Sequence, residues 1–296
     1  MAIVARYRFS EASRHGLRAA VPVACVAVAL CGCSINLGLL TPSADKEEPA
    51  PLVSPSNIVA LGETIKSDPD NPQAYNTRGA ALAQAGRTQD ALADFNKAIS
   101  LDPNYAEAYA NRGLAYHQTR RLDQAMADYQ RAIALDANYA PAHLGRGLIE
   151  KERNQPQEAL EDFNRAIALS PDNAEAHYNR GLLYQNDKQD QLAVEDFTAA
   201  NGLVPQRAEP LVARALSYLA LDKIKEAAAD LDEAVETNPQ NAQAWSTRGL
   251  VYERLGDKTT SAASYARART LRPGDDTARS GWGRTSGFGH GTARSF

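Results

Sequence analysis

The sequence that decides the fold is AEAYANRGLAYHQTRRLDQAMADYQRAIALDANY, residues 106–139, because its pattern returns every 34 residues along most of the chain. The clearest mark of the repeat is an Arg-Gly pair at 78–79, 112–113, 146–147, 180–181 and 248–249, with Arg214-Ala215 at the one remaining step. This register defines six units: 72–105, 106–139, 140–173, 174–207, 208–241 and 242–275. A motif that returns at a fixed interval of this length predicts a stack of identical supersecondary units.

Each unit has the pattern of two helices that pack face to face. In residues 106–139, positions 4, 8 and 11 are Tyr109, Gly113 and Tyr116, which share one face of a first helix. Tyr129 at position 24 shares a face of a second helix with the alanines at positions 20 and 27. Small residues allow the two helices to approach closely, and bulky residues fill the space around the contact. Each unit is therefore predicted to be a helical hairpin, which the proline at position 32 of five units ends.

This pattern resembles the tetratricopeptide repeat family over residues 72–275. The resemblance implies an all-α, right-handed superhelical solenoid of six helical hairpins. Ser54 and Pro55 have the pattern of a helix start, and residues 55–71 are predicted to be a capping helix, or half repeat, that covers the first unit. Residues 276–296 are rich in glycine and are predicted to be a disordered tail with no closing helix. The open end of the stack could be covered by Trp282 or Phe288, or by a second copy of the chain in a homodimer.

Arginine at position 7 and aspartate at position 23 suggest a structural ladder of ion pairs. The arginines are Arg78, Arg112, Arg146, Arg180, Arg214 and Arg248, and the aspartates are Asp94, Asp128, Asp162, Asp196 and Asp230. Because the sixth unit has Ser264 instead, we expect each aspartate to pair with the arginine of the following unit, with pairing inside one unit as the alternative. We prefer the ladder to an anion-binding track, because the arginine face is largely internal and matched by acids.

The N-terminal residues have the order of a secretory signal peptide. An arginine-bearing segment precedes the apolar run AAVPVACVAVAL, residues 19–30, which is too short to span a bilayer. The following Leu30-Cys31-Gly32-Cys33 resembles the lipobox of bacterial lipoproteins. The resemblance implies that residues 1–33 are a signal sequence, that Cys33 is lipidated and that, with Ser34 after it, the chain is held in the outer membrane facing the periplasm. The alternative is an uncleaved inner-membrane anchor from Ala19 to Leu40, also with periplasmic repeats. Residues 34–54 are predicted to be a flexible tether.

Composition and charge exclude several classes of function. The chain has 296 residues, of which 44% are hydrophobic, and a net charge of −4, which does not favour binding to nucleic acid. All three cysteines lie at or before Cys33, so no disulfide joins the repeats. No catalytic triad order, HExxH motif, phosphate loop or zinc-spaced cysteine pair occurs in residues 34–296. His143 and His177 replace the aromatic residue at position 4 and are interpreted as packing residues. We therefore predict no enzymatic activity, no cofactor and no metal.

In the family that the sequence resembles, positions 2, 5, 9, 12 and 13 of the first helices line a concave groove for extended peptides or partner helices. An apolar strip at position 5 crosses units three to five, surrounded by polar residues. The candidate groove residues are Asn76, Asn111, His117, Leu144, Lys151, Tyr178, Gln185, Val212, Leu219 and Arg254. Leu148, Leu182 and Leu216 at position 9 either belong to the groove or are half-buried packing between units. Of the lysine and asparagine clamp that holds C-terminal carboxylates in some relatives, only Asn111 is present.

The sequence therefore predicts a non-enzymatic adaptor, tethered to the membrane in the periplasm, that binds a segment of a partner protein. The overall plan of lipobox, tether and repeats resembles NlpI-type outer-membrane lipoproteins, which implies a scaffold for cell-wall enzymes or a protease. Six regular units leave no room for irregular inserted helices, so no particular partner is carried over. The alternative is a structural or assembly lipoprotein of an envelope secretion or pilus complex.

Overall fold

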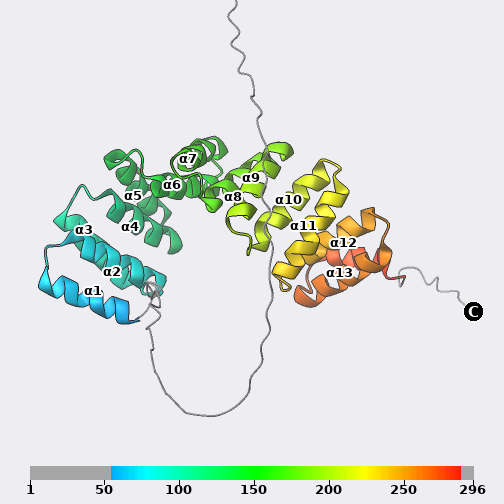
Figure 1. Ribbon diagram of the computed structural model, residues 1–296, viewed down its shortest axis with the longest axis horizontal. Helices are drawn as coiled ribbons and strands as arrows, with labels where there is room; N and C mark the ends of the chain where they lie inside the picture. Colours follow the sequence, from blue (N-terminus) through cyan, green and yellow to red (C-terminus); the bar gives the residue numbers. More distant parts are fainter. Residues whose placement is uncertain (1–54, 288–296) are drawn as a thin grey trace, which may run out of the picture. The chain divides into compact units, whose positions relative to one another are not determined.

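The computed structural model describes residues 55–287, and every element within them is a helix (Figure 1). In chain order the helices are α1 Pro55–Ser67, α2 Pro72–Gln84, α3 Thr88–Leu101, α4 Ala106–Gln118, α5 Leu122–Leu135, α6 Ala140–Glu152, α7 Pro156–Leu169, α8 Ala174–Asn186, α9 Asp190–Leu203, α10 Ala208–Ala220, α11 Ile224–Thr237, α12 Ala242–Arg254, α13 Lys258–Leu271 and α14 Asp276–Thr285. The predicted signal segment 1–33 with Cys33, the predicted tether 34–54 and Phe288 lie outside the described residues. No helix within the described range is long and apolar enough to cross a membrane.

Helices α2 to α13 form the six predicted hairpins, so the prediction of an all-α solenoid is confirmed. Every first helix begins at position 1 of its unit and every second helix at position 17. The turn between them requires a left-handed backbone at position 15, occupied by Gly86, Arg120, Asn154, Lys188, Asp222 and Gly256. This geometry returns the chain so that the second helix packs against the first. The residue at position 24 is completely or almost completely buried in all six units.

The size of the residue at position 24 is matched by position 6 of the following unit. Where position 24 is Phe197, the next unit has Ala213 at position 6, and the two belong to one core cluster. Where position 24 is Tyr129, the next unit has Gly145, whose added Cβ would lie 2.2 Å from the Tyr129 ring. Gly281, after Tyr265, repeats this arrangement at the same 2.2 Å. Tyrosine at position 24 thus requires glycine in the following first helix.

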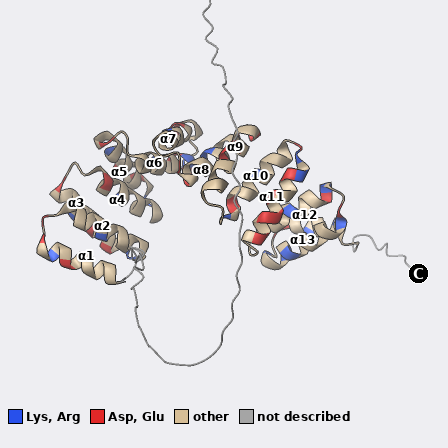
Figure 2. Ribbon diagram, viewed as in Figure 1, with Lys and Arg blue, Asp and Glu red and all other residues tan. Residues whose placement is uncertain are grey.

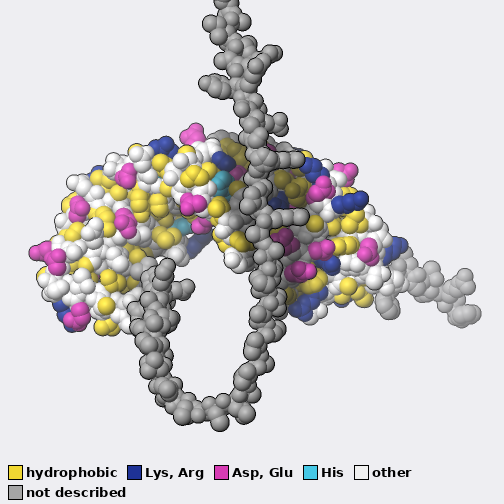
Figure 3. Space-filling view, in the orientation of Figure 1, with side chains coloured by type: hydrophobic (Ala, Val, Ile, Leu, Met, Phe, Trp, Pro, Cys, Tyr) yellow, Lys and Arg dark blue, Asp and Glu magenta, His cyan; other side chains and the backbone are white. Residues whose placement is uncertain are grey.

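The arginines and aspartates pair within each unit, which corrects the expected pairing between units. Arg78 donates two hydrogen bonds of 2.7 Å to Asp94, and Arg112 bonds Asp128 instead of Asp94. Units three to five repeat the paired bonds between positions 7 and 23. The reason is that these positions flank the position 8 and position 24 residues, which touch within one hairpin. Figure 3 shows charges of both signs scattered over the visible face, not a continuous arginine track.

Four of the arginines, Arg112, Arg180, Arg214 and Arg248, also bond the side chain at position 25 of the preceding unit. Arg112 donates to Asn96 at 2.7 Å, and Arg248 donates to Asp232 at 2.7 Å. In the sixth unit the absent aspartate is replaced by Ser264, whose hydroxyl accepts a 2.7 Å bond from Arg248. Aromatic rings at positions 4 and 11 cover the guanidinium groups, as Tyr109 and Tyr116 do for Arg112. The arginines therefore hold both the hairpin and the junction between hairpins.

The two ends of the stack are half units of opposite type. At the N-terminal end, α1 packs on α2 in the way that each second helix packs on the next first helix, as predicted for a cap. At the C-terminal end, α14 packs on α13 and α12 in the way that a seventh first helix would. The prediction of a tail without a closing helix is therefore wrong for residues 276–285. Asp275 caps α14 by accepting a bond from Ala278, and Trp282 packs near Tyr265, which offsets the low helix propensity of the glycines.

Candidate functional site

The first helices form the inner face of the stack. Helices α2 and α4, α4 and α6, α8 and α10, α10 and α12, and α12 and α14 contact each other directly. No two second helices within residues 55–287 make contacts of that extent. Because the first helices lie closer together than the second helices, the stack bends toward them. This is the face on which the groove was predicted.

The structure places the predicted groove residues along this face but buries several of them. Asn76, Val212 and Leu219 are at most 8% exposed, which leaves them little surface to offer a partner. Leu144 and Tyr178 are half-buried and pack against the cores of units three and four. Arg254 is exposed at the end of α12. The apolar strip at position 5 is thus mainly packing.

The predicted polar groove residues instead join neighbouring units to one another. Asn111 donates a 3.0 Å bond to Asn76, and His117 shares a 2.8 Å bond with Glu152. The Lys151 ammonium bonds the amide oxygen of Asn179, and burial lowers the pKa of Lys151. Gln185 donates to the carbonyl of Ala213 at 2.9 Å and to the hydroxyl of Ser217 at 2.8 Å. These bonds join the successive first helices from α2 to α10 and fix their spacing on the inner face.

Two adjoining depressions occupy the inner face from α8 to the start of α14. The first has a volume of about 120 Å³ and is lined by Tyr178, Leu182, Gln185, Glu209, Val212, Ala213, Leu216, Asn241 and Gln243. The second, of about 430 Å³, is lined by Leu216, Gln243, Ser246, Thr247, Leu250, Arg272, Gly274, Asp275 and Thr277. Leu216 and Gln243 line both, so the depressions are neighbours, and we call the two together the inner groove.

The inner groove lies one unit closer to the C-terminus than the sequence predicted. Its apolar floor comes from the position 9 leucines Leu182, Leu216 and Leu250, which are half-buried and so serve both packing and groove. Leu250 and Gln243 were missed, although position 9 reads leucine in five consecutive units. Arg272 and Asp275 were missed because they lie in the connection to α14, which the sequence analysis did not expect.

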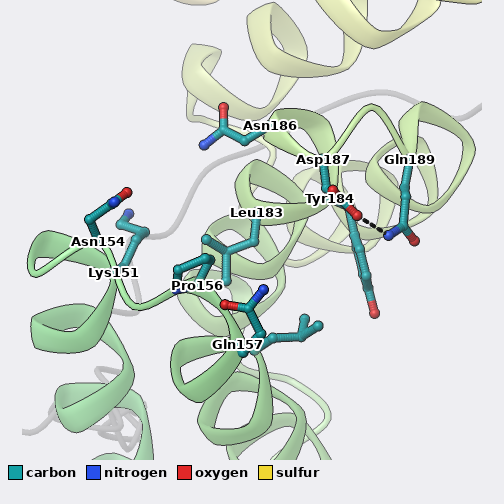
Figure 4. A pocket seen from close by; sticks show the side chains of 10 residues that line it. Lys151, Asn154, Pro156, Gln157, Leu183, Tyr184, Asn186, Asp187 and Gln189 are labelled. Atoms are coloured by element: carbon teal, nitrogen blue, oxygen red, sulfur yellow. Dashed lines mark hydrogen bonds between the residues drawn. The ribbon is translucent and has the colours of Figure 1, made fainter.

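A separate pocket of about 290 Å³ lies between the turns of units three and four (Figure 4). Leu160 and Leu183 supply apolar contacts, and four amide side chains surround them: Asn154, Gln157, Asn186 and Gln189. Gln189 donates a hydrogen bond to the Asp187 carboxylate at its edge. A lining of this kind suits neutral groups with both donors and acceptors. Among the predicted site residues, Lys151 lines this pocket.

The titratable cluster of unit three surrounds Asp162 and is structural. His143 Nδ1 lies 2.9 Å from Asp162, and the other ring nitrogen of His143 lies 3.1 Å from the Ala137 carbonyl. His177 makes the same two contacts, with Asp196 and Pro171. Both nitrogens of each ring are therefore engaged. Within the described residues, no group of three His, Cys, Asp or Glu side chains is arranged to hold a metal ion.

Glu150 gives this cluster a pH dependence. It occupies position 11, where four of the other units have tyrosine, and its Oε2 atom is buried without a hydrogen-bond partner in the described chain. Burial, together with the Asp162 carboxylate, raises the pKa of Glu150 from 4.5 to about 7, while Arg146 opposes the shift. The folded protein therefore keeps a proton that the unfolded chain releases above pH 4.5.

We expect the stability that this proton supplies to be complete below about pH 4.5 and to be lost as the pH rises through about 7. Glu150→Gln, which carries no charge at any pH, should be as stable as the parent at pH 5 and more stable at pH 8. Urea unfolding at both pH values measures this. The matched control is Glu226→Gln, an exposed carboxylate at the start of α11. Parallel pH profiles for Glu150→Gln and the parent protein would contradict the assignment.

Models of the tetratricopeptide repeat match the sequence over more than half of its length. A TPR repeat model matches residues 81–119 and 147–188, and tetratricopeptide repeat models match 106–139, 174–206 and 212–276. No curated protein matches the sequence. These matches fall on the hairpins that the structure shows.

Three solved structures show the same fold. A chain of the APC/C hetero-tetramer Cut9-Hcn1 aligns with a TM-score of 0.65 and 17% identity, over 77% of this chain and 45% of that chain. Pseudomonas aeruginosa pilF aligns with a TM-score of 0.65 and 22% identity, over 71% of this chain and 95% of that one. PilW, a widely conserved type IV pilus biogenesis factor, aligns with a TM-score of 0.61 and 16% identity, over 71% and 97%. This chain thus spans less than half of the Cut9-Hcn1 chain. With its repeat register, its hairpins and these matches, the chain belongs to the tetratricopeptide repeat family.

Proposed function

We propose that the protein is a non-enzymatic adaptor that binds an extended segment of a partner protein in the inner groove. The observation that carries this proposal is the adjacency of the two depressions, which share Leu216 and Gln243 over three successive first helices. Tetratricopeptide repeats typically act as interaction scaffolds, and an extended peptide is the ligand whose length matches a groove of this kind. The pocket between units three and four is smaller in extent and involves two units only.

The lining of the groove indicates what kind of segment it takes. Leucines recur at intervals of one unit along its floor, so the partner is expected to present apolar side chains at regular spacing. Around them lie neutral groups such as Asn241, Gln243 and Ser246, which can bond the backbone of an extended peptide. The charged residues of the lining, Glu209, Arg272 and Asp275, nearly cancel. The partner segment is therefore apolar and close to neutral, not strongly acidic or basic.

A substitution at Gln243 tests the proposal without disturbing the core. Gln243 is exposed and lines both depressions, so Gln243→Trp should fill their junction and reduce capture of the partner by about tenfold or more. Crosslinked co-purification from the cell envelope, followed by mass spectrometry, measures the capture. Gln73→Trp is the matched control, because Gln73 is exposed at the same position of unit one. Equal enrichment with both variants would show that the partner binds elsewhere.

We also propose that the adaptor is a lipoprotein of the outer membrane, facing the periplasm, with an uncleaved inner-membrane anchor as the alternative. The Leu30-Cys31-Gly32-Cys33 sequence after an apolar run supports the first arrangement. The mass of the mature protein should change in Cys33→Ala and on inhibition of lipoprotein signal peptidase, and an unchanged mass would favour the anchor. Cell-wall enzymes or a protease among the captured proteins would support a scaffold of the NlpI type. A stable pilus or secretion complex would instead favour a structural role.

A further inference from the structure

The two ends of the stack are complementary halves of one repeat unit. Helix α14 occupies the place of a first helix but no second helix of its own follows within the described residues. Helix α1 occupies the place of a second helix, and no first helix precedes it there. Residues 38–50 do not have the first-helix pattern, since Thr41, Asp45 and Glu48 stand at its positions 4, 8 and 11. Among residues 55–287, each end thus presents a face that every internal unit covers.

The open face of α14 is seen most clearly at Gly283. It stands at position 8 of α14, and no atom lies within 4 Å of an added Cβ. In the internal units the glycine at position 8 is always filled, as when a Cβ on Gly79 would meet the Phe95 ring at 2.7 Å and one on Gly249 would meet Tyr265 at 2.5 Å. Gly281, two residues earlier, is filled by Tyr265. The space beside Gly283 therefore has room for a position 24 side chain, and no residue of the described range fills it.

Leu61 of α1 is the corresponding position 24 side chain. Every other residue at this position is at most 2% exposed, including Leu231, which shows that leucine fits there. Leu61 is only half-buried, because α1 has no first helix against its other side. The Leu61 side chain at one end of the stack therefore matches the space beside Gly283 at the other end.

At both ends of the stack, the position that carries a charged residue of the ion-pair ladder in the internal units is occupied by an uncharged residue. Position 7 of α14 is Trp282 instead of arginine, and Trp282 lies with its ring centre 4.4 Å from the Arg269 guanidinium carbon. Position 23 of α1 is Ala60 instead of aspartate. A contact between α14 and α1 would thus leave neither an arginine nor an aspartate of the ladder unpaired.

The net charges of the two ends are also opposite by count of their residues, and Figure 2 marks the charged residues along the ribbon. Residues 258–287 contain six lysines or arginines and two aspartates, whereas residues 55–71 contain three acidic residues and one lysine. The net charges are therefore +4 and −2, so that unlike charges meet when the ends of two copies approach. Two like ends would repel each other. Charge thus favours contact between opposite ends of two copies.

We propose that α14 of one copy and α1 of another pack together as a composite seventh hairpin, so that copies of the chain join head to tail. The occupant of each open face is a second copy of this chain. Such a contact is heterologous and can extend beyond two copies. Asn57 and Thr64 are larger than the alanines usual at positions 20 and 27, so the composite hairpin packs less closely than an internal unit and the association is reversible.

Filling the space beside Gly283 tests the proposal directly. Gly283→Leu should weaken self-association of the purified full-length chain about tenfold or more, measured by light scattering and sedimentation velocity over micromolar concentrations. Gly202→Leu is the matched control, because Gly202 in α9 also has no atom within 4 Å of an added Cβ. Both variants should keep the helical content and melting temperature of the parent protein. A parent protein that stays monomeric, or association that Gly283→Leu leaves unchanged, would overturn the proposal.

Mixing two blocked variants separates head-to-tail contact from a symmetric dimer. Gly283→Leu keeps an intact α1 face, and Leu61→Asp keeps an intact α14 face. Each variant alone should be monomeric, whereas their mixture should form dimers and nothing larger, since only one productive contact remains. A mixture that stays monomeric, or variants that dimerise separately, would contradict a contact between α14 and α1.

Discussion

Asp196→Ala is expected to lower the free energy of unfolding by about 3 kcal/mol, because it leaves two side chains without their acceptor. The Asp196 side chain is 4% exposed and accepts two bonds from Arg180 and one contact from His177 Nδ1. Removing one partner of a buried ion pair costs more than the pair contributes, since the remaining charge stays desolvated. Urea unfolding followed by circular dichroism measures the change. Glu195→Ala is the matched control, as Glu195 is the exposed neighbour on the same helix, and it should change stability by less than about 0.5 kcal/mol.

Unit six supplies a design that should rescue this loss. There Ser264 stands in place of the aspartate, and Arg248 is held instead by Asp232 at position 25 of the preceding unit. The double variant Asn164→Asp and Asp196→Ser reproduces this pairing for Arg180, which already donates a 2.8 Å bond to Asn164. It should recover more than half of the stability that Asp196→Ser loses alone. If Asp196→Ala were no less stable than Glu195→Ala, the ladder would have no structural role.

Gly145→Ala is expected to destabilise the protein by about 1–3 kcal/mol, because the new methyl group would overlap the Tyr129 ring. The added Cβ would lie 2.2 Å from Tyr129 Cζ and 2.6 Å from its hydroxyl oxygen, so the ring or α6 must shift. The effect opposes the gain of about 0.5–1 kcal/mol that alanine normally brings over glycine inside a helix. Gly62→Ala in α1 is the control, since its Cβ would meet only Arg78 at 3.8 Å.

The second substitution Tyr129→Phe should restore part of the stability lost in Gly145→Ala, because it removes the contact with the hydroxyl oxygen although the ring carbon Cζ remains. The double variant then has the same pair of residues as Phe197 and Ala213, which meet at the junction of units four and five. Thermal melts of the parent, both single variants and the double variant give the coupling energy between the two sites. A double variant as unstable as Gly145→Ala alone would contradict the size match between positions 24 and 6.

The 34-residue repeat predicted most of the fold, because residues 34 apart meet the same environment in every unit. The bounds of six hairpins follow from the position of one Arg-Gly pair. The pairing of Asp94 could not be decided in this way, since both its own unit and the following unit offer an arginine at an equivalent place. Helix α14 was missed because propensity alone disfavours glycine in a helix, whereas here Gly281 is required for contact with Tyr265.

The candidate site was harder to predict than the fold, because it too depends on contacts between units. Positions that share a helix face share a direction, but whether Val212 or Leu216 remains accessible depends on how neighbouring units close over it. Periodicity alone thus determined the helices, their order and the face on which the groove lies. Tertiary packing decided which residues of that face stay open, which arginine each aspartate holds, and that the described part of the stack begins and ends with a half unit. These features depend on contacts between helices that one period of sequence does not contain.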